Sequence, residues 1–471
     1  MTQKIDMLNG GLFKKIVLFT IPIMLQGLLQ SLYNSADLVV VGQFSGDIAL
    51  SAVGATSSIF NVLVGLFMGF SAGVDVTSSH AFGKGDYKAV KRIIDTAVIT
   101  APFLGLIVTI FGAIVAGPVL AIMDTPVEDG VLAQATTYLQ ILMIGVPFTM
   151  LFNFCAAVLR TSGETNKPFI YLATSGLINV LLNLLFCGAF SMGVVGVAVA
   201  TVISQVISAI MILINLLVNK GLFSFSFKSI EFSWKSLGKI TAIGLPSGLQ
   251  SSVFSLSNVF LQTGVNSFGK DAIAGSTAVS TVEGLMWVTL TSFLNATTTF
   301  VSQNIGAGNL KRARKVVRYT LLMTAILGLV LGLSAFFAKE LILAIFIKDN
   351  PVAVQYGIER LTFTFPIYFL AGIMGVLPGA IRGLGYSVSP TIISLVGVCG
   401  MRILWVYTVF PIFNNLAILY LIHPITWVLS STALFINYFI ALHLRKKKMG
   451  ESKPKEEETT EQEIPPRAAK I

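Results

Sequence analysis

Two carboxylates, Asp37 and Glu283, lie inside long apolar runs, where ionisable side chains are rare because an unpaired charge is costly in lipid. A carboxylate in such surroundings binds a proton or a cation, or it pairs with a buried base. Glu283 is expected about 12 residues into its run, close to the middle of a bilayer, and it therefore needs a partner. Asp37 is nearer the end of its run, and we expect it either to line a cavity or to mark the membrane interface.

Two partners are available for Glu283. Arg402 is the one arginine that the sequence places deep in an apolar run, so the two residues can form a structural ion pair. Trp287 follows Glu283 by one helical turn, and a carboxylate beside an aromatic ring can hold an organic cation by ion pairing and cation–π attraction. We keep both interpretations, with Glu283 and Trp287 as a substrate site and Arg402 as a structural ion-pair partner.

The sequence predicts neither a metal centre nor an enzyme. His80, His423 and His443 form no ligand cluster, and the three cysteines lie in apolar runs without the spacing of a metal or disulfide framework. The glycine-containing loops lack the lysine and the Ser or Thr of a phosphate-binding loop. We therefore expect no catalytic residues and no cofactor.

These side chains must be positioned by membrane-spanning helices. Of the 471 residues, 54% are hydrophobic and 11% are charged, whereas about 25% of the residues in soluble domains are charged. A helix needs about 20 apolar residues to cross the hydrocarbon core of a bilayer. The expected fold class is an all-α polytopic membrane protein with twelve transmembrane helices. These helices are predicted at residues 13–41, 48–79, 93–117, 131–159, 168–190, 194–218, 237–266, 272–303, 316–338, 354–381, 389–411 and 414–443.

The distribution of Lys and Arg predicts how the helices are oriented. With the N-terminus in the cytoplasm, the inner loops carry nineteen basic residues and the outer loops four, which are Lys270, Lys339, Lys348 and Arg360. Because basic residues favour cytoplasmic loops, both termini are expected in the cytoplasm and the protein in a bacterial-type plasma (inner) membrane. The net charge of +10 then reflects topology, and no nucleic-acid partner is expected.

The two halves of the chain resemble each other at a nearly constant offset. Pro22 and Gln26 recur 224 residues later as Pro246 and Gln250. The segment FGKGDYKAVKR recurs 223 residues later as IGAGNLKRARK, and LRTSGETNKP recurs 222 residues later as IRGLGYSVSP. Each half has six helices, an even number, so both halves start on the same side of the membrane. The sequence therefore predicts two parallel six-helix repeats.

This repeat predicts the division of the chain. We expect a first lobe over residues 1–218, a cytoplasmic linker over 219–236 and a second lobe over 237–443. The remaining residues, 444–471, are polar and highly charged and lack an apolar period, so we predict a disordered cytoplasmic tail.

Taken together, these segments resemble the multidrug and toxic compound extrusion (MATE) family. The likeness covers roughly residues 10–443. It is carried by PIMLQGLLQSLYNSADLVVVGQF in the first helix, by the loops AFGKGD and SQNIGAGN, and by the paired segments LRTSG and IRGLG. The resemblance implies a two-lobed exporter of drug-like, amphipathic and often cationic compounds, driven by H⁺ or Na⁺. It implies contact with membrane lipids and no obligate protein partner.

The resemblance also implies a role for Asp37, which matches the first-helix aspartate that is central to coupling in this family. The DinF-like branch places Asn and Asp one turn apart on the fifth helix, near a Thr on the sixth. This chain has Asn179, Asn183 and Thr201 at these places, with Asn183 where a carboxylate would be expected. Residues four apart share a helical face. Their oxygens suit a hard cation such as Na⁺, although such residues also join helices by hydrogen bonds.

The expected function is secondary active multidrug efflux by alternating access, in exchange for H⁺ or Na⁺. The first alternative is a lipid-linked saccharide flippase of the same superfamily, whose members often have cationic cavities that hold pyrophosphate. The candidate charges here, Asp37 and Glu283, are acidic and favour the exporter. A channel or a membrane enzyme is a second alternative, for which the sequence contains no signature.

Overall fold

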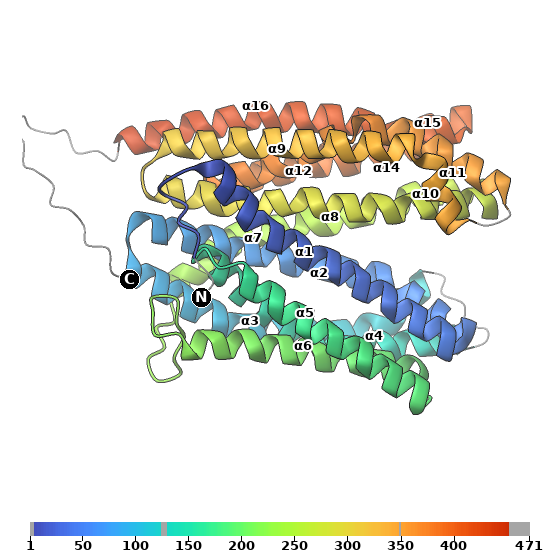
Figure 1. Cartoon of the computed structure of the whole chain (residues 1–471), viewed down its shortest axis with the longest axis horizontal. Helices are drawn as coiled ribbons and strands as arrows, with labels where there is room; N and C mark the ends of the chain where they lie inside the picture. Colours follow the sequence, from blue (N-terminus) through green and yellow to red (C-terminus); the bar gives the residue numbers. More distant parts are fainter. Residues whose placement is uncertain (1–3, 124–129, 348–349, 452–471) are drawn as a thin grey trace, which may run out of the picture.

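Long helices lying side by side make up nearly all of the computed structural model, which describes residues 4–123, 130–347 and 350–451 (Figure 1). No strand occurs in these ranges. The apolar runs form helices because a helix satisfies its backbone hydrogen bonds internally, as lipid requires. The helices are α1 (Leu12–Phe44), α2 (Gly46–Lys84), α3 (Tyr87–Ile122), α4 (Val131–Thr161), α5 (Asn166–Asn183), α6 (Gly193–Val218), α7 (Trp234–Asn266), α8 (Lys270–Gly306), α9 (Leu310–Phe337), α10 (Lys339–Phe346), α11 (Pro351–Thr364), α12 (Tyr368–Gly383), α13 (Val388–Ser394), α14 (Met401–Phe413), α15 (Leu416–Tyr420) and α16 (Ile422–Glu451).

Some of these helices join into longer rods. α5 continues into a π-helical segment, Leu184–Ala189, and a second π-helical segment, Leu395–Gly400, joins α13 to α14. A single 3₁₀ turn, Phe365–Ile367, joins α11 to α12. With these joints counted and the short α10 and α15 set aside, the described residues form the twelve rods that the sequence predicts.

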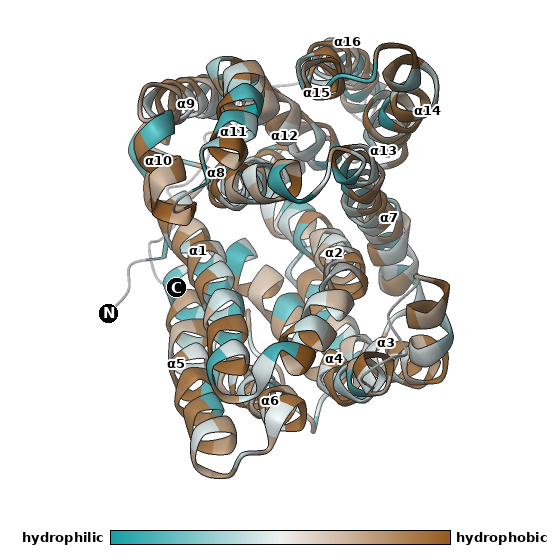
Figure 2. Ribbon diagram, turned by 90° about the vertical axis from the view of Figure 1, so that its right-hand side faces the viewer, coloured by the Kyte–Doolittle hydropathy of each residue, from teal (hydrophilic) through white to brown (hydrophobic). Residues whose placement is uncertain are grey.

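Ten of the rods are long and apolar enough to cross a membrane by composition alone, and α7 and α8 are the two that are not. Both are long, with 33 and 37 residues, but they are rich in Ser, Thr, Gly and Asn. Polar residues of this kind belong in the interior of a membrane bundle rather than against lipid. The outer faces of the bundle are hydrophobic, as Figure 2 shows for the view along the helices, and carry exposed side chains such as Phe103 and Ile114.

The sequence repeat is also a structural repeat. Gly85 ends α2 and Gly308 follows α8, and both adopt a left-handed backbone, with φ of 77° and 75°. A residue without a Cβ is favoured in this conformation, which explains why both loops carry glycine there. Each loop then caps the next helix, because the Asp86 side chain accepts from Ala89 N and the Asn309 side chain accepts from Arg312 N.

Glycines bring the first half of the chain, α1–α6, into close contact with the second half, α7–α16. A Cβ placed on Gly69 of α2 would lie 2.0 Å from the nitrogen of Gly248 in α7. A Cβ placed on Gly73 would lie 2.2 Å from the carbonyl oxygen of Ile240. Small residues allow helix backbones to approach this closely in membranes. The two halves therefore meet backbone to backbone along α2 and α7.

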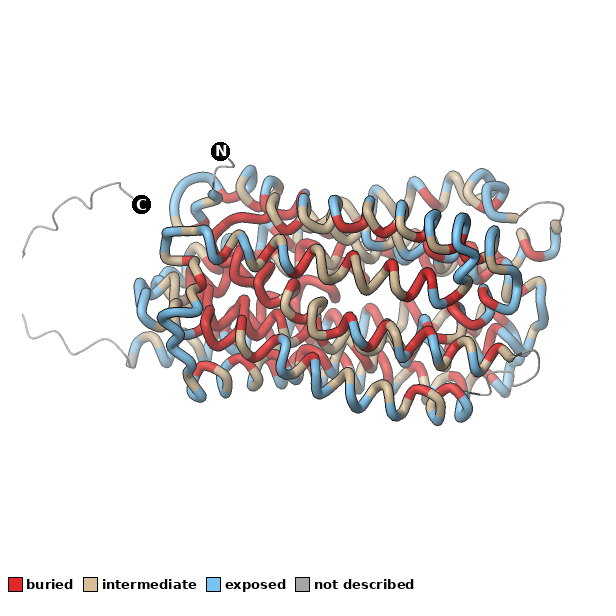
Figure 3. Tube along the Cα trace, turned by 90° about the horizontal axis from the view of Figure 1, so that it is seen from below, coloured by how far each residue is buried: buried red, intermediate tan, exposed pale blue. Residues whose placement is uncertain are grey.

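A buried polar cluster joins the halves near the end of the bundle where α1 begins and α16 ends, called here the terminal end (Figure 1). Asp75 of α2 is 1% exposed, and its Oδ2 atom lies 3.4 Å from Arg160 Nε in α4. Thr299 of α8 donates to the same oxygen at 2.8 Å, and Gln303 Nε2 donates to the Thr161 carbonyl oxygen at 2.6 Å. Figure 3 shows that buried residues gather in this part of the bundle.

The segment before α1 adds to this connection. The carbonyl oxygen of Met7 accepts from Asn304 Nδ2 of α8 at 3.2 Å and from Arg312 Nε of α9 at 3.1 Å. The N-terminal segment of the first half is thereby bonded to the second half at the terminal end.

Two predicted segment boundaries differ from the helix ends that the structure shows. Residues 444–451 were predicted to be disordered, but α16 continues to Glu451, and Arg445 Nη2 lies 3.2 Å from His80 Nε2. The rest of the predicted tail, 452–471, and Lys348 lie outside the described residues. The predicted linker, 219–236, is shorter than expected because α7 begins at Trp234.

The arrangement yields a test of orientation. Lys88 and Lys311 are exposed at the terminal end, whereas Lys270 is exposed at the opposite end. We expect Lys88→Cys and Lys311→Cys to react with a membrane-impermeant thiol reagent only after cells are permeabilised, and Lys270→Cys to react in intact cells. Background labelling should be low because Cys155, Cys187 and Cys399 are buried. Labelling of Lys88→Cys from outside intact cells would reverse the predicted topology.

Candidate functional site

Each half of the chain encloses a cavity in the part of the bundle away from the terminal end. The first cavity, of about 160 Å³, lies among α1, α2, α4 and α6. The second, of about 260 Å³, lies among α7, α8 and the helices from α11 to α16. Both are lined by ionisable side chains, which are rare within membrane-spanning helices and usually mark functional positions, so both cavities are candidate sites.

Asp37 is the one acidic side chain among those that line the first cavity. It is 8% exposed, and its Oδ1 atom accepts a hydrogen bond of 2.5 Å from Asn183 Nδ2. The same Asn183 nitrogen lies 3.3 Å from Asn179 Oδ1, and Asn179 Nδ2 lies 3.4 Å from Thr201 Oγ1. The structure therefore brings together the four side chains that the sequence singled out in the first half.

Local structure explains this grouping. Asn179 and Asn183 lie one turn apart on α5, so both face α1 and α6, and the π-helical segment begins immediately after Asn183. Asn183 Oδ1 is buried and has no hydrogen-bond partner among the described residues. A carboxylate beside an unpartnered amide oxygen is a set of atoms that can hold a proton or a hard cation. Sequence reasoning missed Asn34 and Tyr138, which also line the cavity.

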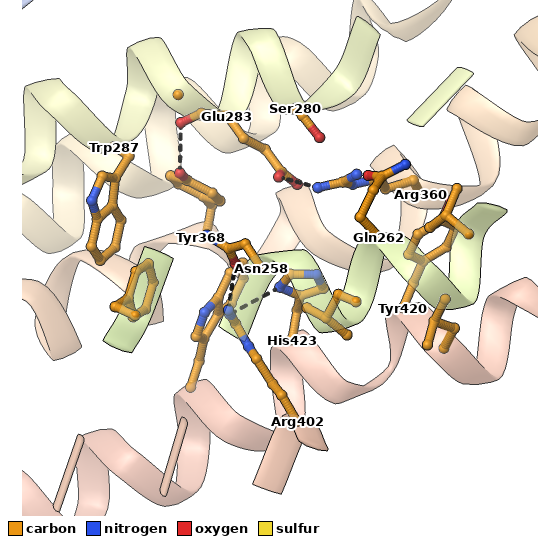
Figure 4. A pocket seen from close by; sticks show the side chains of 16 residues that line it. Asn258, Gln262, Ser280, Glu283, Trp287, Arg360, Tyr368, Arg402, Tyr420 and His423 are labelled. Carbon is orange, nitrogen blue, oxygen red and sulfur yellow. Dashed lines mark hydrogen bonds and ion pairs between the residues drawn. The ribbon is translucent and has the colours of Figure 1, made fainter. Parts of the chain in front are cut away.

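The second cavity is organised around an ion pair between α8 and α11 (Figure 4). Glu283 Oε2 lies 2.6 Å from Arg360 Nη2, and Arg360 Nη1 donates to the Ser276 carbonyl oxygen at 3.1 Å. The hydroxyl of Tyr368 donates to the Glu283 carbonyl oxygen at 3.0 Å. Glu283 is thus held by two neighbouring residues before any ligand is considered.

The predicted ion pair between Glu283 and Arg402 is therefore wrong. Arg402 Nη1 donates to Asn258 Oδ1 at 2.7 Å and to Ser257 Oγ at 3.2 Å, and Arg402 Nη2 lies 3.4 Å from His423 Nδ1. The physical reason is the packing of the helices, because α11 lies against α8 whereas α14, which carries Arg402, lies against α7.

Arg360 was missed because it was counted with the outer loops. It lies within α11 and is 8% exposed, so it belongs to the interior of the bundle. The signal was its place inside the apolar stretch 354–381, where an arginine needs a partner.

Trp287 lines the second cavity, as predicted, but its ring is paired with another ring. Trp287 and Phe254 stack with centroids 5.2 Å apart and planes 5° from parallel. This pair also borders a neighbouring cavity of about 270 Å³ between α2 and the second half, where Arg382 Nη2 donates to Gln250 Oε1 at 2.5 Å. The stacked rings therefore lie at the boundary of two cavities.

Within the part of the chain that the structure describes, no group of three or more His, Cys, Asp or Glu residues is placed to hold a metal ion.

Comparison with known proteins identifies relatives along nearly the whole chain. The MatE family model matches residues 22–185 and again 246–408, so the two matches begin at Pro22 and Pro246. The probable multidrug resistance protein YpnP of Bacillus subtilis (strain 168) is 27% identical over 397 residues, which cover 84% of this chain and 88% of YpnP. The probable multidrug resistance protein NorM of Thermotoga maritima is 26% identical, with 83% of this chain and 84% of NorM covered.

A solved structure has the same fold. It is described as the outward-facing conformation of a multidrug resistance MATE family transporter, and it matches with a TM-score of 0.86 at 22% identity. The match covers 95% of this chain and 99% of that one. The predicted fold class, with twelve helices in two repeats, is confirmed.

The Glu283–Arg360 pair gives a test of the second cavity. Removing one partner leaves a buried, unpaired charge, so Glu283→Gln and Arg360→Gln should each destabilise the fold by about 3–5 kcal/mol. The double variant should regain part of this loss, as measured by thermal unfolding of the purified protein. Arg92 and Glu231, an ion pair whose side chains are 54% and 53% exposed, supply the control, with single changes of about 0–1 kcal/mol. Simple addition of the two losses would contradict the pairing.

Proposed function

Because the chain belongs to the MatE family, whose members are transporters and not enzymes, we propose that it is a secondary active exporter. It moves drug-like amphipathic compounds out of the cell in exchange for H⁺ or Na⁺. The observation that carries the proposal is the buried cluster of Asp37 with Asn183, Asn179 and Thr201, a place for a coupling cation in a protein without a nucleotide-binding motif. The names of YpnP and NorM, both described as multidrug resistance proteins, support the choice of substrates.

Alternating access fits the placement of the contacts and the cavities. The proposed lobes, 1–218 and 237–443, are joined by Asp75, Gln303 and the Met7 carbonyl at the terminal end. Both cavities lie in the other part of the bundle. If the terminal end is cytoplasmic, as the basic residues predict, this arrangement is closed towards the cytoplasm and corresponds to an outward-facing state. Export then requires these terminal contacts to break while the opposite ends of the lobes approach.

Coupling in this proposal depends on the charge of Asp37. A proton on the carboxylate, or a Na⁺ ion shared by the carboxylate and the unpartnered Asn183 Oδ1, neutralises the cluster. When the Asp37 carboxylate is charged, it needs the hydrogen bond that the Asn183 side-chain N–H donates to it. When Asp37 is protonated, its O–H can donate a hydrogen bond instead. The contact between α1 and α5 is therefore different in the two forms. The ion drives transport only as far as it binds one conformation better than the other.

The lipid-linked saccharide flippase remains as the second candidate because of one observation. The second cavity is lined by two arginines, Arg360 and Arg402, which suit phosphate groups. The acidic cluster at Asp37 and the names of YpnP and NorM favour the exporter. Transport of a fluorescent lipid-linked saccharide, with no drug efflux under any gradient, would select the flippase.

Asp37→Asn tests the proposal directly. The amide keeps the shape of the side chain and an oxygen for Asn183 but cannot gain or lose a charge, so gradient-driven efflux of a fluorescent drug from liposomes should be abolished. The thermal unfolding temperature should stay close to that of the unchanged protein. The assay is run under a pH gradient and, separately, a Na⁺ gradient, which also identifies the ion.

The matched control is Asp47→Asn, at an exposed aspartate in the first turn of α2 that lines neither cavity. It should leave efflux unchanged. Efflux at the unaltered rate in Asp37→Asn liposomes would place the coupling carboxylate elsewhere.

A further inference from the structure

We propose that the second cavity binds the carboxylate of an amphipathic aromatic compound, rather than the organic cation that Glu283 and Trp287 had suggested. The inference rests on the proposed function, for which it names the class of substrate. The main evidence is the charge of the cavity lining, which includes two guanidinium groups, Arg360 and Arg402, and one carboxylate, Glu283. Glu283 Oε2 is already paired with Arg360 at 2.6 Å, and although Glu283 Oε1 is buried without a hydrogen-bond partner, the two guanidinium groups outnumber the one carboxylate and leave the lining with a net positive charge.

Arg402 is the cation that lacks a counter-ion. It is 2% exposed, and no acidic side chain in the described part of the chain forms an ion pair with it. Its nearest partners are the amide of Asn258, the hydroxyl of Ser257 and the ring of His423. A buried guanidinium held only by uncharged groups is costly, and an anion beside it would lower that cost.

The geometry of the guanidinium group indicates which anion fits. Arg402 Nη1 is occupied by Asn258 and Ser257, whereas Nε is buried without a partner and Nη2 has one long contact, to His423. Nε and Nη2 lie on one edge of the guanidinium, and this edge accepts both oxygens of a single carboxylate. Figure 4 shows the group reaching between Asn258 and His423 into the cavity.

Aromatic rings surround this charge and favour a planar, apolar body for the ligand. Phe254 stacks on Trp287, and the Arg402 guanidinium lies 5.2 Å from the Phe254 ring centroid. Tyr368 packs edge-on against Trp427 with centroids 5.4 Å apart. An aromatic compound gains both ring contacts and apolar burial in such surroundings. Beyond the Phe254–Trp287 stack, the neighbouring cavity of about 270 Å³ offers room for a longer apolar part.

The two lobes carry opposite charges at related places. In the first lobe, Asp37 of α1 meets Asn183 of α5. In the second lobe, Asn258 of α7 meets Arg402 of α14, and α7 and the α13–α14 rod are the first and fifth rods of their half. The cation and the carboxylate would therefore occupy separate cavities without competing for one site.

The test is binding of 1-naphthoate to the purified full chain in nanodiscs of uncharged lipid, followed by quenching of tryptophan fluorescence. Trp287 and Trp427, two of the four tryptophans, line the cavity. The matched cation is 1-naphthylmethylammonium. We expect 1-naphthoate to bind more tightly than the amine, and Arg402→Gln to weaken its binding by about tenfold or more. Glu283→Gln should tighten 1-naphthoate binding, because it releases Arg360 from its partner.

Two further variants serve as controls for this binding experiment. Arg402→Lys keeps the charge but loses the pair of N–H donors that binds both oxygens of a carboxylate, so it should still weaken 1-naphthoate binding by about fivefold. This variant replaces Arg402→Gln if the loss of the charge prevents folding. Arg318→Gln removes an exposed arginine at the terminal end of α9 and should change the affinity by less than about twofold, since exposed charges are screened. Unchanged 1-naphthoate binding in both Arg402 variants would overturn the proposal. It would also be overturned if 1-naphthylmethylammonium bound more tightly than 1-naphthoate and if Glu283→Gln abolished the binding of this amine.

The outcome can be separated from that of the transport proposal because binding needs no gradient. Asp37→Asn should still bind 1-naphthoate while it loses efflux. If the unchanged protein binds 1-naphthoate but exports nothing under either gradient, the exporter proposal fails and the anion site stands. If it exports cationic drugs only and does not bind 1-naphthoate, the anion site fails and the exporter stands.

Discussion

A charged side chain inside this bundle can find its partner only in the protein, because lipid offers no hydrogen bond to replace the one lost with water. Each buried ion here therefore fixes the relation between two or more helices. Asp75 joins α2 to α4 and α8, and Glu283 joins α8 to α11. Asp37, Arg382 and Arg402 differ from these, because their hydrogen-bond partners are uncharged side chains and no ion pair within the described residues compensates their charges. We infer that the charged side chains in ion pairs stabilise the fold, whereas those with only uncharged partners can still bind a charged ligand.

This distinction changes how the transport cycle is understood. In a protein with one acidic cavity, the coupling ion and an organic cation would displace each other from the same carboxylate. Here the first cavity carries Asp37 and the second carries an excess of arginine. In the proposed transport cycle, coupling between them is then conformational, and contacts such as that of Thr299 with Asp75, which connect the two halves, would transmit it. The opposite signs of charge favour simultaneous occupation of the two cavities over exchange at one.

The helices were predictable from the sequence, and the pairing of their charges was not. Long runs with few charges place the rods, since spanning a bilayer sets their length, although α7 and α8 are less apolar than the other ten. Spacing along one helix also predicted that Asn179 and Asn183 share a face, and the structure places Asp37 on it. Which helix lies beside α8 depends on packing between segments far apart in sequence, so Glu283 was assigned to Arg402 instead of Arg360. Arg360 was overlooked because the ends of apolar runs are poorly defined by composition alone.

The glycine contact between α2 and α7 has a mechanical consequence. At Gly69 and Gly248 the backbones themselves set the distance between the helices, and side chains such as Leu66 and Phe70 of α2 pack into the space that the glycines of α7 leave. In the proposed transport cycle, this contact is the place where the two helices can turn against each other while the distance between them stays fixed. A methyl group on Gly69 or Gly73 would meet backbone atoms that have nowhere to move. The smallest residues in the bundle thus set how closely its two halves approach each other.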